Sequence, residues 1–210
     1  MPGTKFSQGK PYLSIVQGAL VMPCEKGAPE SRERAWEASD GSKGVKHEIV
    51  YQNWTGKILG ITFKTGEYGE SCYVELEDAI LQLGTAGRYF KDFACKILSG
   101  DMKKEFIFHP YNMEVDGGKK VTGISIKQNG EKLKNYFYDY NTKTTLGGFP
   151  EVDNTKKEKK TYWKVYFSLV EEFLIEKLKE IQFDKSEKTT KDEPLEPFEA
   201  EVMKNELPWE

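Results

Sequence analysis

The feature of this 210-residue sequence that most constrains its fold is a succession of short runs rich in β-branched and aromatic residues. Glycine, aspartate and asparagine separate these runs at regular spacing, which is typical of the strands and turns of an antiparallel sheet. The sequence therefore predicts a mainly β protein. We expect seven strands, at residues 12–22, 47–64, 71–77, 80–83, 105–113, 121–127 and 132–140.

Two local signals refine this prediction. Asn129-Gly130 supplies the two residues of positive φ that a type I′ turn needs, so we expect a hairpin between the last two strands. The strand at 47–64 is too long to be flat, and Gly56 and Gly60 within it allow a bulge and a sharp bend. Such a strand can belong to both sides of a small barrel.

Two helices are predicted from apolar residues at helical spacing. The first spans residues 86–98 and precedes Gly100, which acts as a stop signal. The second spans residues 161–181, and its apolar stripe must be buried on its own domain or on a partner. The stripes consist of Phe90, Phe93, Ala94 and Ile97 in the first helix and Trp163, Phe167, Val170, Leu174, Leu178 and Ile181 in the second.

Three strands, a helix and two strands, with a bent first strand, follow the order of the oligonucleotide-binding (OB) fold. We therefore predict an OB-fold antiparallel barrel with additional strands, one short internal helix and one C-terminal helix. This domain covers residues 1–182 and includes a mobile loop at 25–46, which is charged and rich in turn residues. Residues 183–210 show no apolar periodicity and are predicted to form a disordered acidic tail.

Charge is divided unevenly along the chain. The net charge is −3, but residues 183–210 hold nine acids and four lysines, so residues 1–182 carry +2. The cysteines Cys24, Cys72 and Cys95 have no spacing typical of a metal or redox site, and no nucleophile motif occurs. We expect reduced thiols, no cofactor and no enzyme activity. The N-terminal residues are too polar for a signal peptide, which predicts a cytoplasmic protein.

Aromatic and basic residues alternate along the strand predicted at 132–140. Lys134, Tyr136, Tyr138 and Tyr140 fall on one face, which offers rings for base stacking and a cation for phosphate. The alternative interpretation is that these tyrosines, favoured in strands, merely cover the sheet.

The same pairing of rings with cations recurs elsewhere. Trp54 precedes Lys57, and Lys64, Tyr68 and Tyr73 surround the turn that joins the first two barrel strands. That turn is one lip of the ligand groove in an OB fold, and the loop at 116–120, with Lys119 and Lys120, is the other. We therefore predict contacts to single-stranded nucleic acid from these residues.

The tail carries large apolar residues among its acids. Phe198 lies between glutamates and prolines, and the chain ends Glu206-Leu207-Pro208-Trp209-Glu210. Apolar anchors in a solvated segment are typical of motifs that a partner captures. The alternative is that the tail lies on its own barrel.

With this predicted barrel and this ending, the chain resembles the single-stranded DNA-binding proteins of tailed bacteriophages. Those proteins have an OB fold and an acidic C-terminal tail closed by an aromatic residue; here that residue is Trp209, where the bacterial proteins of this class have phenylalanine. The resemblance implies that the protein coats single strands during replication and recombination in a bacterial host cell. It also implies that the tail recruits replication or recombination proteins, among them polymerase, helicase or primase, and competes with DNA for the groove. The alternative function is an OB-fold adaptor that binds a protein and no nucleic acid.

Overall fold

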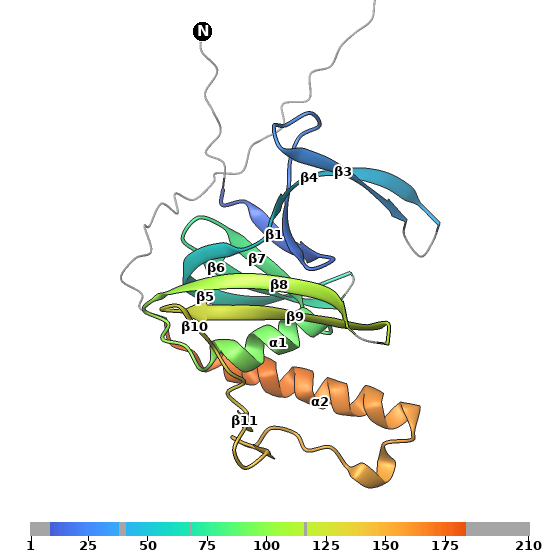
Figure 1. Ribbon diagram of the computed structural model, residues 1–210, viewed down its shortest axis with the longest axis vertical. Coiled ribbons are helices and arrows are strands. Elements are labelled where there is room, and N and C mark those ends of the chain that lie inside the picture. The colour runs from blue at the N-terminus through green and yellow to red at the C-terminus, as the bar shows by residue number, and fades with distance from the viewer. Residues whose placement is uncertain (1–8, 38–40, 68, 116, 184–210) are drawn as a thin grey trace, which may run out of the picture.

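The computed structural model describes residues 9–37, 41–67, 69–115 and 117–183. Tyr68 and the tail residues Phe198, Glu206, Leu207, Pro208, Trp209 and Glu210 therefore lie outside the described residues. The prediction of a mainly β fold is confirmed (Figure 1). The strands are β1 (Tyr12–Val16), β2 (Ala19–Pro23), β3 (Ser31–Glu37), β4 (Lys43–Tyr51), β5 (Trp54–Gly66), β6 (Gly69–Leu76), β7 (Ile80–Gly84), β8 (Glu105–Val115), β9 (Lys119–Gln128), β10 (Glu131–Lys132), β11 (Tyr138–Asp139) and β12 (Thr144–Thr145). The helices are α1 (Arg88–Ile97), the 3-10 helix η1 (Asn154–Lys156) and α2 (Lys160–Lys179).

Ten of these strands form one sheet, in the order β10-β9-β8-β5-β6-β7-β1-β2-β4-β3. Every neighbouring pair is antiparallel except β1 and β7, which are parallel, so the sheet is mixed. Within the described residues no ladder joins β7 to β9, and the sheet is open rather than a closed barrel. The remaining strands, β11 and β12, pair with each other in a separate two-stranded sheet.

Two local predictions are confirmed in this sheet. The ladder between β5 and β6 shifts register between Ile58 and Gly60, which is the bulge expected from the glycine. The β9–β10 hairpin places Gln128 opposite Glu131, with positive φ at Asn129 and Gly130 as a type I′ turn requires.

The N-terminal strand predicted at 12–22 is in fact a hairpin. Gln17 and Gly18 both have positive φ and form a tight turn between β1 and β2. The sequence signal was weaker than Asn-Gly, and the turn was missed for that reason. Gly18 is needed here because a Cβ atom would lie 2.4 Å from the backbone nitrogen of Asn112 on β8. The hairpin therefore lies along β7 on one side and contacts β8 on the other.

The predicted mobile loop at 25–46 was wrong for residues 31–37 and 43–46, which belong to β3 and β4. Sequence reasoning counted the charges there as solvated, but they pair with one another across the two strands. Arg32 and Arg34 both donate to the carboxylate of Glu48, at 2.8 to 3.1 Å, and Glu48 is buried. The β3–β4 hairpin projects from the body of the protein (Figure 1). The predicted strand 47–64 divides between β4 and β5, which pair with different neighbours.

The predicted strand 132–140 was also wrong. Only Glu131 and Lys132 form β10, and the amide of Leu133 still donates to the carbonyl of Ile126 on β9 at 2.8 Å. The chain then leaves the sheet and crosses to α1, where the amide of Tyr136 donates to the carbonyl of Cys95 at 2.7 Å. The chain leaves the sheet here because this path buries the side chain of Phe137. Its ring packs against those of Phe149 and Phe173, at centroid distances of 5.3 and 5.1 Å.

Both predicted helices are confirmed, and the apolar face of α1 is buried beneath the sheet. Phe90, Phe93, Ala94 and Ile97 are fully buried against the strands. In α2 the second half packs on the domain through Val170, Leu174, Ile175 and Leu178, so its apolar stripe is covered by its own chain there. The first half is different, since Val165, Phe167 and Leu169 are exposed.

The cysteines provide a test of this core. Burial raises the pKa of the Cys72 and Cys95 thiols to about 12, whereas Cys24 is partly exposed. Because the thiolate is the reactive form, a thiol reagent should label one cysteine in the native protein and three after denaturation. Cys24→Ser should abolish native labelling. Native labelling of Cys72 or Cys95 in that variant would contradict the fold.

The Glu48 cluster predicts a pH-dependent contribution to stability. Burial alone raises the pKa of Glu48, but the hydrogen bonds and positive charge of Arg34 and Arg32 outweigh it and hold this pKa below its ordinary value. A carboxylate with a lowered pKa in the folded state stabilises the protein above the ordinary value, about 4.3, and loses this effect as pH falls through the lowered pKa.

Glu48→Gln should therefore lower the free energy of unfolding by about 1.5 to 3 kcal/mol near neutral pH, and by less near about pH 3. Urea titrations at the two pH values measure this difference. Glu33→Gln on the same hairpin is the control, because Glu33 is exposed and should change stability little. An equal loss of unfolding free energy in the two variants would show that the buried Glu48 carboxylate has no special role in stability.

Candidate nucleic-acid interface

The outer face of β5, β6, β7 and β1 carries outward-pointing polar and aromatic residues. Along β6 the side chains of Cys72, Val74 and Leu76 point into the core, so Tyr73 between them points outward. The ladders place Thr62 of β5 and Gln82 of β7 on either side of Tyr73. We call this surface the tyrosine face.

Two tyrosines form the centre of the tyrosine face. The rings of Tyr12 and Tyr73 lie 6.2 Å apart and are nearly perpendicular, and Tyr12 is 49% exposed. The ammonium of Lys64 lies 5.4 Å from the Tyr73 ring centroid, within cation–π range. Gln82 donates to the hydroxyl of Tyr73 at 3.3 Å. This arrangement presents an edge and a face of aromatic carbon beside a cation, with hydrogen-bonding groups next to them.

Charge on the tyrosine face is partly neutralised. Lys10 forms an ion pair with Glu75 at 2.9 Å and also donates to the carbonyl of Leu76 at 2.7 Å. Lys64 is exposed near the end of β5. The face therefore offers more stacking surface than net positive charge.

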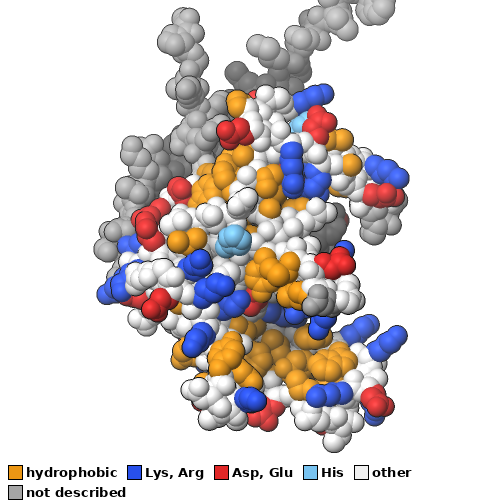
Figure 2. Space-filling view, in the orientation of Figure 1, with side chains coloured by type: hydrophobic (Ala, Val, Ile, Leu, Met, Phe, Trp, Pro, Cys, Tyr) orange, Lys and Arg blue, Asp and Glu red, His pale blue; other side chains and the backbone are white. Residues whose placement is uncertain are grey.

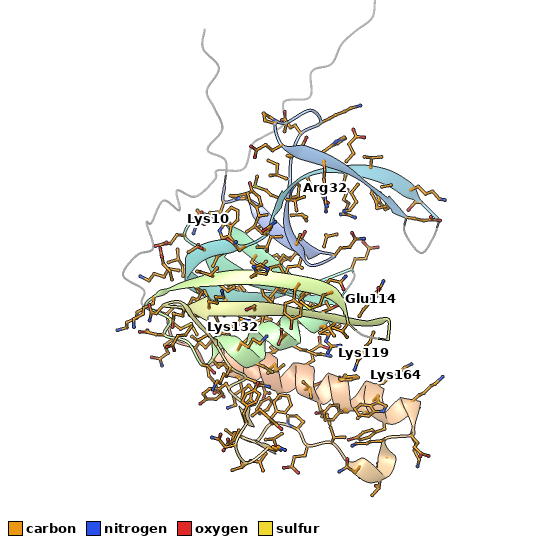
Figure 3. The ribbon with its side chains drawn as sticks, in the orientation of Figure 1. Lys10, Arg32, Glu114, Lys119, Lys132 and Lys164 are labelled. Atoms are coloured by element: carbon orange, nitrogen blue, oxygen red, sulfur yellow. The ribbon has the colours of Figure 1, made fainter. Side chains whose placement is uncertain are left out.

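The β5–β6 hairpin and the β8–β9 hairpin lie at opposite ends of β5. β8 pairs with the first residues of β5, whereas β6 pairs with β5 up to the last residue of β5. The β5–β6 hairpin closes at one end, where Gly66 pairs with Gly69, and Tyr68 lies outside the described residues. The β8–β9 hairpin lies beyond the other end, and its lysines Lys119 and Lys120 are exposed. Figure 3 labels Lys119 together with Glu114, which stands opposite Lys120 in the ladder.

The remaining predicted residues are not brought to the tyrosine face. Trp54 packs on the core; its indole N–H donates to Asp78 at 3.1 Å, and its ring lies 5.0 Å from Tyr51. Lys57 is half-buried opposite Glu105. Both residues lie at the start of β5, before the bulge.

The segment at 134–140 lies beside α1 rather than on the sheet. Tyr136 is exposed, and Lys134 is exposed with its carbonyl accepting from the Ser99 hydroxyl. The rings of Tyr138 and Tyr140 contact each other at 5.0 Å. The predicted row of tyrosines along a strand therefore does not exist, because its residues are not in one strand.

Sequence reasoning missed Tyr12 and Gln82 as members of the tyrosine face. Gln82 lies between the buried residues Leu81 and Leu83, so the alternation of side chains along the strand could have predicted that it points outward. Tyr12 reaches this face only because β1 pairs with β7 in parallel, with Tyr12 opposite Ile80. No local pattern in the sequence reports that pairing.

No group of three or more His, Cys, Asp or Glu side chains that could hold a metal ion occurs in the described part of the chain. Nor does that part contain a helix long and apolar enough to cross a membrane. Comparison with known proteins provides no relative, since no family model, no curated protein and no solved structure matches the chain. Functional inference therefore depends on the arrangement of its residues.

Proposed function

We propose that this protein binds single-stranded DNA without strong sequence preference, through the tyrosine face. The observation that carries the proposal is the pair Tyr12 and Tyr73, with Lys64 within cation–π distance of Tyr73. Exposed rings stack on any base, and neighbouring cations attract the phosphates, so this combination is suited to sequence-tolerant binding.

The strand order supports an OB-type arrangement for this surface. Strands β9-β8-β5-β6-β7 are consecutive in the sheet, and α1 lies between the third and fourth of them along the chain, as in an OB fold. We infer an opened barrel in which the β1–β2 hairpin occupies the place where the ends would pair. OB folds bind oligonucleotides on the second and third strands, which here are β6 and β7.

The acidic tail has a separate role in this proposal. Residues 183–210 carry a net charge of −5 and end in Leu207-Pro208-Trp209-Glu210. We infer that Phe198 and Trp209 anchor a replication or recombination protein, as in the phage single-stranded DNA-binding proteins that the sequence resembles. The tail also repels DNA phosphates and competes for the cationic groups of the domain.

Titration with fluorescent oligo-dT tests the binding surface. Wild-type binding should weaken with added salt and quench aromatic fluorescence, because stacking and counterion release both contribute. Tyr12→Ala with Tyr73→Ala should weaken binding by about 2 to 6 kcal/mol if both rings stack.

The matched control is Tyr136→Ala with Tyr140→Ala, two exposed tyrosines away from the sheet. Affinity should change little in this folded control. Loss of binding in the control alone would move the site to residues 134–140. A wild-type protein that binds a protein partner but no oligo-dT would favour the adaptor alternative.

Truncation after Asp184 tests the tail. The cut removes eight acids and four lysines, so oligo-dT affinity should rise at low salt and change little at high salt, where charge is screened. A tail tethered by a flexible linker competes at roughly millimolar effective concentration. The melting temperature should be unchanged, as the segment has no apolar periodicity. Weaker binding after truncation would show that the tail contributes to the DNA site.

A further inference from the structure

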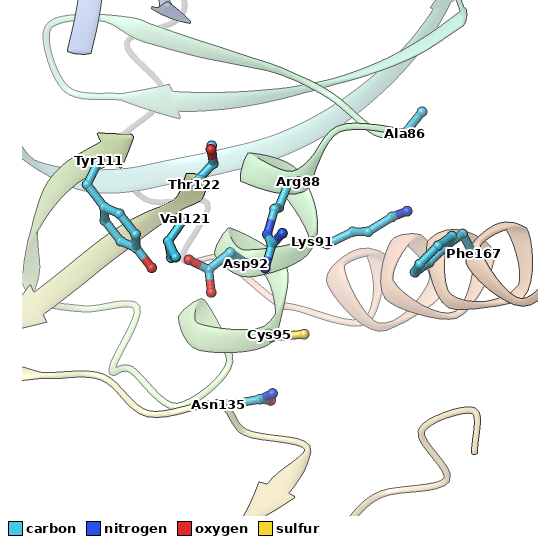
Figure 4. Close-up of a pocket in the computed structure, with 10 residues that line it drawn as sticks. All are labelled: Ala86, Arg88, Lys91, Asp92, Cys95, Tyr111, Val121, Thr122, Asn135 and Phe167. Atoms are coloured by element: carbon cyan, nitrogen blue, oxygen red, sulfur yellow. The ribbon is translucent and has the colours of Figure 1, made fainter. Parts of the chain in front are cut away.

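A pocket of about 580 Å³ opens between α1, the β8–β9 pair and α2 (Figure 4). Arg88 and Lys91 of α1 line it between Tyr111 of β8 on one side and Phe167 of α2 on the other. It lies away from the tyrosine face, because α1 packs on the opposite side of the sheet. The other lining residues are Ala86, Asp92, Cys95, Val121, Thr122 and Asn135.

The charge of this pocket is positive. Its acid, Asp92, is compensated, since its carboxylate accepts from Lys96 and from the amide of Ile124, both at 2.7 Å. Lys91 lies 4.6 Å from the centroid of the Phe167 ring, within cation–π distance, and Arg88 is exposed. The pocket thus combines the Phe167 ring with two cations, whereas the tyrosine face combines two rings with Lys64.

The first half of α2 continues the combination of aromatic rings and cations beyond the pocket. Residues 156–164 contain five lysines, two aromatic residues and one acid, namely Lys156, Lys157, Lys159, Lys160 and Lys164, Tyr162 and Trp163, and Glu158. Lys160, Trp163, Lys164 and Phe167 follow the i, i+3, i+4, i+7 spacing and share one helix face. The rings of Trp163 and Phe167 lie 5.7 Å apart.

This face is left open by the rest of the described chain. Phe167 is 46% exposed, and Lys164 is exposed. Figure 2 shows hydrophobic side chains with Lys and Arg among them over the part of the view where α2 lies. Lys119 and Lys120 immediately precede the pocket residues Val121 and Thr122 on β9, and Figure 3 places Lys119 and Lys164 on the same side of the molecule. Lys119 and Lys120 of the β8–β9 hairpin therefore lie next to the pocket.

We propose that this pocket and the adjoining face of α2 form a second contact surface for single-stranded nucleic acid. This inference rests on the proposed function and extends it: a strand that crosses the tyrosine face continues past Lys119 and Lys120. Arg88, Lys91 and Lys164 contact its phosphates, and Phe167 stacks on a base. Charge complementarity favours a polyanion over an apolar protein segment as the occupant, because cations line and flank the exposed ring.

Two variants of the full chain test the surface. The first is a double charge reversal of the proposed surface, Arg88→Glu with Lys164→Glu. Its control makes the same change in net charge at exposed positions outside that surface, Lys26→Glu with Lys132→Glu. Figure 3 shows Lys132 on the other side of the molecule from Lys164. Phe167→Ala removes the ring, with Leu169→Ala as its control, since Leu169 is also exposed on α2 but does not line the pocket. Circular dichroism verifies folding.

Affinity for oligo-dT of ~6 and of ~25 nucleotides is then measured across a salt series. For the long strand the double reversal should weaken binding at least tenfold more than its control, and should reduce the salt slope by about 1.4, since two phosphate contacts are lost. Phe167→Ala should weaken binding of the long strand by about 5-fold to 150-fold, as expected for the loss of one stacked base. The short strand should bind all four variants like the wild type, because it is held on the tyrosine face.

Other outcomes separate this inference from the proposed function. If the long strand binds the double reversal and its control equally, with the same salt slope, the second surface does not exist while the proposed function stands. If the wild type binds neither oligonucleotide, both proposals fail. If Tyr12→Ala with Tyr73→Ala has no effect on either strand while the pocket variants weaken both, the pocket is the DNA site and the tyrosine face is not.

Discussion

The packing of α1 against the inner face of the sheet is the contact on which the rest of the structure depends. Phe90, Phe93 and Ile97 of this helix are completely buried, and the ring centroids of Phe93 and of Phe108 on β8 lie 6.3 Å apart. Each side chain of this size contributes about 1.5 to 3 kcal/mol when it is buried. Because the strands curve around one helix, β5 to β9 must direct their alternating apolar residues to the same side. Their polar and aromatic residues consequently share the other side.

The distribution of binding groups follows from this packing. Tyr73 and Gln82 point outward and are half-buried, because the residues next to them in β6 and β7 fill the core. Below α1, the second half of α2 completes the core through Val170, Leu174 and Leu178, whereas its first half extends past α1 with Phe167 uncovered. The protein therefore presents aromatic rings beside cations on two sides of one core.

Accuracy of the sequence predictions depended on how local each signal was. The Asn129–Gly130 turn, the bulge before Gly60 and both helices were predicted correctly, because each requires only neighbouring residues to agree. The strand predicted at 132–140 failed because Phe137 gains more by burial against α2 than it would in an edge strand. The alternation of Tyr136, Tyr138 and Tyr140 resembles a strand, but alternation alone does not supply a partner strand. Part of the predicted site was consequently assigned to a face that does not exist.

Sequence alone determined the β character of the chain, the helices, the Asn129–Gly130 turn, and the division of charge between residues 1–182 and the acidic residues 183–210. These properties follow from composition and from periods of 2 and 3.6 residues, which involve only close neighbours. The tertiary structure decided that Glu48 is buried between two arginines, that Tyr12 joins Tyr73, and that Phe167 of α2 meets Arg88 and Lys91 of α1. Each of these contacts joins residues at least 14 positions apart. Which distant segments meet is selected by packing and pairing across the whole domain, and no local pattern encodes that choice.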